Sequence, residues 1–195
     1  MVRLGNLSAN RAIEPTGSSQ AFGIMIGIPL TAYIRLLRNR GICAEYEAAS
    51  CVGWAISTLE AGRDGSGLRI LASLEAPFSY PEVQNSVDRA FEELNVATLR
   101  GADAVTAYGA ELIQAMLRDT LSDETALGEL RDLCREHDYQ SDLVMFYQIQ
   151  DALDELPILP EVDRNWRGAT REDVLADFRR YAIGWLEQYQ SLSQR

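Results

Sequence analysis

Apolar residues recur at intervals of three and four along most of the chain, the spacing that places them on one face of an α-helix. The segment 44–61 shows the pattern well, with one apolar stripe formed by Ala48, Cys51, Val52, Ala55, Ile56 and Leu59. No segment predicts a strand. We therefore predict an all-α protein, either an antiparallel helical bundle or stacked helical hairpins. About eight helices are expected, over residues 30–40, 44–61, 68–74, 79–94, 102–119, 123–136 and 142–156 and from 171 onward.

Residue types at the ends of these segments support the predicted boundaries. Ser79 begins Ser-Tyr-Pro-Glu, a capping box with proline in the first turn. Ser122 and Ser141 are placed to cap the next two helices after 102–119. Thr170 begins a similar box in which Asp173 replaces the usual glutamate. The last helix is expected to pack across several earlier ones through Val174, Phe178, Tyr181, Ile183, Trp185 and Leu186.

The chain has 195 residues, 47% of them hydrophobic, which suits one domain with a substantial core. Residues 1–20 lack helical periodicity, so we predict an irregular N-terminal leader before a single α-helical domain over 21–195. The longest apolar run, 22–34, is shorter than the roughly 18 residues that a membrane-spanning helix needs. An odd count of three cysteines favours a reducing compartment, so we expect a cytoplasmic protein.

Acidic residues outnumber basic ones by 29 to 18, which gives a formal charge of -11. This charge repels phosphate backbones and anionic lipid surfaces, so nucleic acid and membranes are not expected as partners. All the basic residues are arginine. The absence of lysine excludes Schiff-base chemistry and a phosphate-loop lysine.

The single histidine, His137, lies three residues after Cys134, so the two side chains could share one helix face. A zinc site needs three or four protein ligands, and the sequence has no second Cys/His pair. A hydroxyl-His-carboxylate triad would have to use His137 alone, and no Gly-x-Ser-x-Gly motif is present. We therefore predict no catalytic residue, no metal and no cofactor, and expect that the protein is not an enzyme.

Two carboxylate pairs leave an enzyme alternative open. Glu129 and Asp132 are three residues apart on one predicted helix, and Asp151 and Asp154 are three apart on the next. All-helical magnesium-dependent nucleotide hydrolases use such pairs on two facing helices. The alternative function is therefore an all-α magnesium-dependent nucleotide hydrolase.

Residues 151–163 form an acidic strip before the last helix. A loop that contains arginine and tryptophan directly follows this strip. Such a strip is usually a solvated helix face, but it also suits an anionic surface for docking a partner. Trp and Arg are enriched at the energetic centres of protein interfaces. The candidate partner-binding residues are Asp151, Asp154, Glu155, Glu161, Asp163, Trp166 and Arg167.

Three segments resemble a pattern seen in bacterial toxin-immunity proteins of polymorphic-toxin and contact-dependent inhibition systems. They are residues 68–74 followed by 82–94, residues 142–147 followed by Asp151 and Asp154, and residues 166–171. The resemblance implies a small cytoplasmic protein that binds a toxin domain encoded by an adjacent gene and blocks its active surface. Many toxin domains act on nucleic acid and are basic, so an acidic inhibitor gains electrostatic steering.

These observations predict an acidic α-helical interaction protein, most simply an immunity-type inhibitor of a cognate bacterial toxin. The magnesium-dependent hydrolase is the second hypothesis. The third is a structural or oligomeric scaffold protein.

Overall fold

The computed structural model describes residues 30–138, 140, 142–156 and 169–193. These residues form eight α-helices and no strand, which confirms the all-α prediction. The helices are α2 (Thr31–Arg40), α3 (Glu45–Glu60), α4 (Ser66–Ala72), α5 (Tyr80–Glu93), α6 (Gly101–Leu117), α7 (Asp123–Glu136), α8 (Val144–Glu155) and α9 (Arg171–Ser193). The predicted leader over 1–20 lies outside the described residues.

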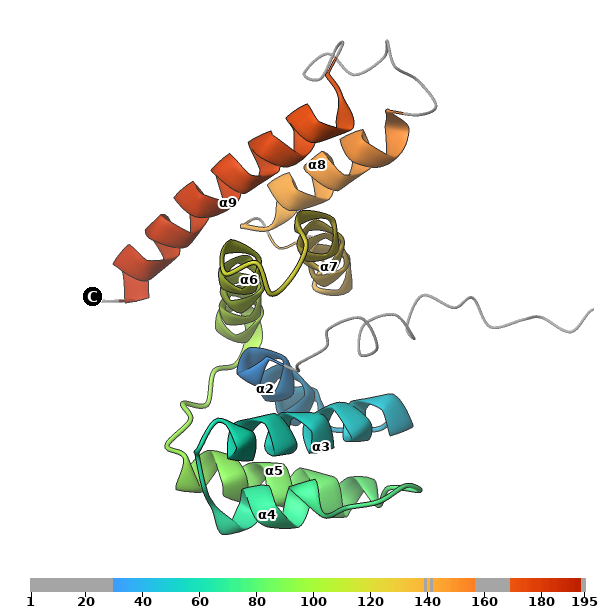
Figure 1. Ribbon diagram of the computed structural model, residues 1–195, viewed down its shortest axis with the longest axis vertical. Coiled ribbons are helices and arrows are strands. Elements are labelled where there is room, and N and C mark those ends of the chain that lie inside the picture. Colours follow the sequence, from blue (N-terminus) through green and yellow to red (C-terminus); the bar gives the residue numbers. More distant parts are fainter. Residues whose placement is uncertain (1–29, 139, 141, 157–168, 194–195) are drawn as a thin grey trace, which may run out of the picture.

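The helices stack along the long axis of an elongated molecule (Figure 1). Helices α3, α4 and α5 lie together at one end, and α8 and α9 lie at the other. Between them, α2 packs against α6, and α6 packs against α7. Helices adjacent in sequence form the closest pairs, as in α4 with α5 and α7 with α8. The arrangement is therefore one of stacked hairpins, since short connections bring consecutive helices together.

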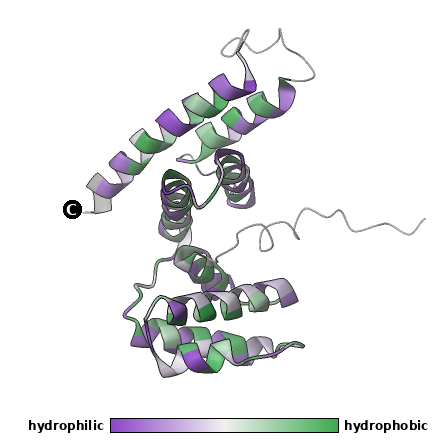
Figure 2. Cartoon of the chain, in the orientation of Figure 1, coloured by the Kyte–Doolittle hydropathy of each residue, from purple (hydrophilic) through white to green (hydrophobic). Residues whose placement is uncertain are grey.

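One continuous cluster of buried hydrophobic side chains draws on all eight of these helices. Each helix also carries hydrophilic residues (Figure 2), and within the described residues no helix has the length and apolar character needed to cross a membrane. The largest fully buried side chains are Tyr108, Phe146, Phe178, Ile34, Leu37, Leu68, Leu71, Leu112, Ile113, Met116, Leu127 and Leu130.

Helix α9 covers α6, α7 and α8, as predicted, but through a narrower face than the sequence suggested. Its buried residues follow a strict four-residue spacing: Val174, Phe178, Ala182 and Leu186. Ile183 is 40% exposed, so its assignment to the packing face was wrong. Ile183 directly follows Ala182, and one residue along an α-helix turns the side chain by about 100°, so Ile183 points away from the centre of the buried line. Tyr181 is 37% exposed but still packs edge-on against the core, with its ring centroid 5.2 Å from that of Phe146.

Two of the predicted caps are present in the structure. The Ser122 hydroxyl oxygen accepts a hydrogen bond of 3.2 Å from the backbone N–H of Thr125. Thr170 and Asp173 form the reciprocal box: the Asp173 carboxylate accepts from the Thr170 N–H at 2.8 Å, and the Thr170 hydroxyl accepts from the Asp173 N–H at 3.3 Å. Both helices therefore begin where the sequence predicted.

The start of α5 agrees with the prediction, whereas the start of α8 differs. Ser79 is the N-cap of α5, but its side chain makes no capping hydrogen bond. The segment 142–156 becomes helical only at Val144, with Leu143 as the N-cap, and the predicted cap Ser141 lies outside the described residues.

Candidate functional site

The C-terminal end of α8 carries three carboxylates of the predicted acidic strip. Asp154 and Glu155 are exposed, Asp151 is half-buried, and the last turn contains no basic residue. Peptide dipoles give the C-terminal end of a helix a partial negative charge, so carboxylates there are unfavourable for stability. The end of α8 is therefore an anionic surface that the folded chain maintains at some cost in stability.

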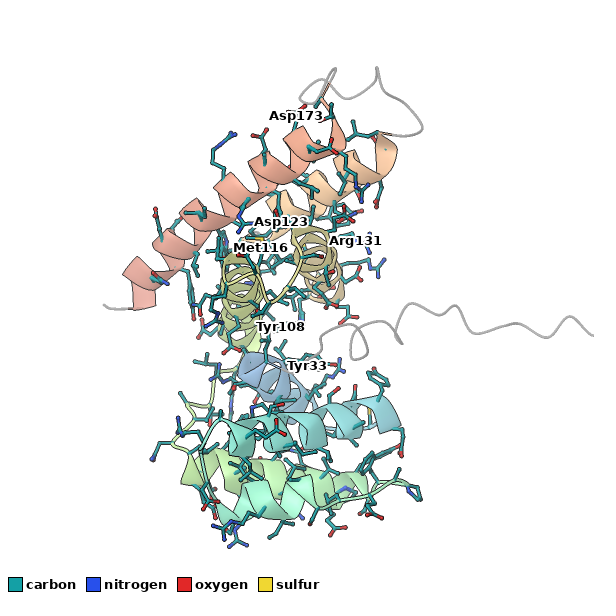
Figure 3. All side chains as sticks on the ribbon, viewed as in Figure 1. Tyr33, Tyr108, Met116, Asp123, Arg131 and Asp173 are labelled. Carbon is teal, nitrogen blue, oxygen red and sulfur yellow. The ribbon has the colours of Figure 1, made fainter. Side chains whose placement is uncertain are left out.

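One arginine of the adjacent helix offsets part of this charge. This residue is Arg131, on α7 (Figure 3). Its Nη1 lies 3.4 Å from Oδ2 of Asp154, and its Nε lies 2.9 Å from Oδ1 of Asp132. The Gln150 side-chain amide also donates to Asp154, at 2.7 Å. Asp154 is thus held in position. In the described part of the chain, the other two carboxylates at this end of α8 form no ion pair.

The remaining residues of the predicted partner-binding set are Glu161, Asp163, Trp166 and Arg167, and they lie outside the described residues. The structure therefore places three of the predicted residues, Asp151, Asp154 and Glu155, and brings them together on one helix end.

The carboxylate pairs of the hydrolase alternative do lie on adjacent, contacting helices, α7 and α8. They do not converge on a common point for a cation, since no group of three or more His, Cys, Asp or Glu side chains among the described residues is arranged to hold one. Arg131 bridges Asp132 and Asp154, and Arg135 lies 3.3 Å from Asp132. A guanidinium thus stands between the pairs where a cation would be needed.

Glu129, the first residue of the α7 pair, is buried, with only 8% of its surface exposed. Its Oε2 atom and the Tyr108 hydroxyl are both buried, and these two groups interact with each other. Burial raises the pKa of Glu129 to about 7, and the charges of Asp132 and Glu136 act in the same direction, whereas the nearby Tyr108 hydroxyl opposes them. The sequence pattern identified Glu129 as one of a carboxylate pair but did not indicate that its carboxyl group is buried.

Tyr108 itself lies where α6 meets α2, with its ring centroid 5.4 Å from that of Tyr33 (Figure 3). Burial is the main reason that the pKa of Tyr108 lies well above its usual value, and the Glu129 charge adds to it. The interior of the α2–α6–α7 junction therefore contains ionisable groups that favour their neutral forms.

Cys134 and His137 do not combine into a site. Cys134 is fully buried in the core, whereas His137 is exposed at the C-cap of α7. Burial raises the pKa of the Cys134 thiol, which makes it a poor nucleophile.

No protein-family model, curated protein or solved structure matches this chain.

Proposed function

We propose that this chain is an acidic α-helical interaction protein of the toxin-immunity type, which binds a basic partner through the C-terminal end of α8. The observation that carries the proposal is the set of three carboxylates there, Asp151, Asp154 and Glu155, of which only Asp154 forms an ion pair among the described residues. The resemblance of three sequence segments to immunity proteins supports the same assignment.

Two acidic residues of α7 have local structural roles that Asp151 and Glu155 of α8 lack. Asp123 and Glu124 lie in the first turn of α7, where carboxylates interact favourably with the helix dipole. They also pair with arginines of α9: Asp123 with Arg179 at 2.9 Å, and Glu124 with Arg171 at 2.9 Å. The carboxylates of α8 lie at a helix C-terminus, where their interaction with the helix dipole is unfavourable. A partner that supplies arginine or lysine would remove the repulsion among them.

The net charge adds a long-range contribution. At -11, the chain attracts basic proteins and gains association rate from electrostatic steering, up to about 10⁸ M⁻¹s⁻¹ at low salt. A toxin domain that acts on nucleic acid has the complementary charge. All three cysteines are free thiols, which suits action in the reducing cytoplasm, where an immunity protein meets its toxin.

The experiment measures binding of the purified chain to the product of the adjacent gene by surface plasmon resonance, at low and at physiological salt. The test variant carries Asp151→Asn, Asp154→Asn and Glu155→Gln. The matched control carries Glu60→Gln, Glu75→Gln and Glu92→Gln, three exposed residues of the α3–α5 end, and changes the net charge equally.

We expect the α8 variant to associate about tenfold more slowly or worse and to lose much of its salt dependence, while the control stays close to the parent. Equal effects of the two variants would mean that binding depends only on the net charge of the chain and that the end of α8 is not the interface. No binding of the parent chain to the adjacent product would contradict the immunity assignment.

A further inference from the structure

A pocket of about 190 Å³ opens where α2, α6 and α7 meet near the start of α3. It is separate from the acidic end of α8, and Glu129 is not among the residues that line it. Its apolar wall is formed by Leu36 and Leu37 of α2, Ala104 of α6 and Leu133 of α7, with Tyr33 beside them. These residues come from three helices far apart in sequence, so the pocket exists only in the folded chain.

One side of the pocket offers hydrogen-bond donors from α2 and α6. Gly101, in the first turn of α6, lines it, and the N-cap residue Arg100 makes no side-chain capping bond, so the first N–H groups of α6 lack a side-chain partner there. Asp103, the acidic residue of that turn, does not line the pocket. Arg40 lies on the wall as well. Its guanidinium pairs with Glu47 through Nη2 and is half exposed.

The opposite polarity comes from α7, which ends at the pocket. Glu136 is the last residue of α7 and His137 is its C-cap, and both line the pocket. Helix C-termini carry partial negative charge, and the Glu136 carboxylate adds a full one. Among the described residues Glu136 forms no ion pair. Since α6 begins and α7 ends here, the pocket has hydrogen-bond donors from α2 and α6 on one side and the carboxylate of α7 on the other.

We propose that this pocket binds a free α-amino acid with an apolar side chain. The carboxylate of such a ligand pairs with Arg40 and the start of α6, its ammonium group pairs with Glu136, and its side chain contacts Leu36 and Leu133. The volume fits this class of ligand, since an apolar cavity of about 150 Å³ accepts benzene. A ligand with only one of the two charges leaves one polar group of the pocket desolvated and unpaired, which costs affinity.

The first test is isothermal titration calorimetry of the full chain with L-leucine and L-phenylalanine. Two leucine analogues serve as matched probes: 4-methylpentanoate, which lacks the ammonium group, and 3-methylbutylamine, which lacks the carboxylate. We expect at least one amino acid to bind with a Kd tighter than about 1 mM. Each single-charge analogue should bind about tenfold more weakly or worse. Equal binding of the analogues, or no binding of either amino acid, overturns the proposal.

The second test uses Glu136→Gln, which changes an exposed side chain and is expected to leave the fold intact. It should weaken binding of the amino acid about tenfold while leaving the weak binding of 4-methylpentanoate unchanged. Glu92→Gln, an exposed residue of α5, is the matched control and should change neither. Arg40→Gln should have the converse effect: it should abolish binding of 4-methylpentanoate and leave binding of 3-methylbutylamine unchanged. Amino-acid binding that is unaffected by Glu136→Gln would place the ligand elsewhere and reject this site.

Discussion

Arg131 of α7 reaches across to Asp154 of α8, with 3.4 Å between the guanidinium Nη1 and the carboxylate Oδ2. The contact joins residues 23 positions apart in sequence. It is the link between the acidic end of α8 and the carboxylate pair of α7, and it bears on both functional hypotheses.

Replacing Arg131 by Gln should make the end of α8 more negative. Because the ion pair is partly solvated, we expect the free energy of unfolding to change by no more than about 1 kcal/mol, as measured by urea denaturation. Association with the basic partner should become faster and more dependent on salt. Arg69→Gln removes an exposed, ion-paired arginine from α4 and serves as the control. Identical kinetics for the two variants would show that Arg131 does not tune the interface.

Glu129 should make stability depend on pH around neutrality. Burial raises the pKa of its carboxyl group to about 7 in the folded chain, whereas the unfolded chain keeps an ordinary value near 4.5. Between these two values the folded state binds the additional proton, so stability falls as pH rises through this range. The destabilisation is complete above the folded pKa and absent below the unfolded one.

Glu129→Gln keeps the shape of the side chain and removes the ionisation. We expect it to be more stable than the parent by about 2 kcal/mol at pH 8, with little difference at pH 4. Urea denaturation at the two pH values measures this, and carbon-13 NMR of the carboxyl group gives its pKa directly. A parent chain whose stability does not fall between pH 5 and 7 relative to this variant would contradict a buried, titrating Glu129.

Gly67 allows α4 and α5 to approach each other closely. A β-carbon at this position would lie 2.5 Å from the backbone nitrogen of Ala90, and a backbone atom cannot turn aside as a side chain can. Gly67→Ala should therefore destabilise the chain by about 1–3 kcal/mol or more in thermal or urea unfolding. Gly128→Ala, in the middle of α7 with open space around it, should instead be neutral or stabilising by up to about 1 kcal/mol. Similar losses in both variants would mean that helix approach at Gly67 is not the cause.

Trp185 fixes α9 to the start of α8. Its indole N–H donates to the Asp142 carbonyl oxygen at 2.9 Å, and its ring packs edge-on against Phe146, with centroids 5.8 Å apart. Trp185→Phe should cost about 1 kcal/mol through the lost hydrogen bond, and Trp185→Ala about 3 kcal/mol through the added cavity. Ile183→Ala, on the exposed side of α9, should change stability by less than about 0.5 kcal/mol. Circular dichroism during urea unfolding measures the stability of all three variants. If Trp185→Ala were as stable as Ile183→Ala, Trp185 would not fix α9 to the start of α8.

The amino-acid sequence by itself determined the helices and several of their ends. Apolar spacing and end signals such as Ser122 and Thr170 act within a few residues, so they can be interpreted without knowledge of the fold. The acidic end of α8 was predictable for the same reason, because Asp151, Asp154 and Glu155 are neighbours in the chain.

Only the tertiary structure decided how far each apolar stripe is buried and which distant charges meet. Ile56 and Ile183 belong to apolar stripes but lie at their edges, and whether an edge is covered depends on the neighbouring helix. The burial of Glu129, the link from Arg131 to Asp154 and the α2–α6–α7 pocket all require helices that are separated in sequence to stack in one particular order. Helical periodicity fixes the direction of a side chain within its own helix, whereas the long-range packing of the core sets what that side chain meets.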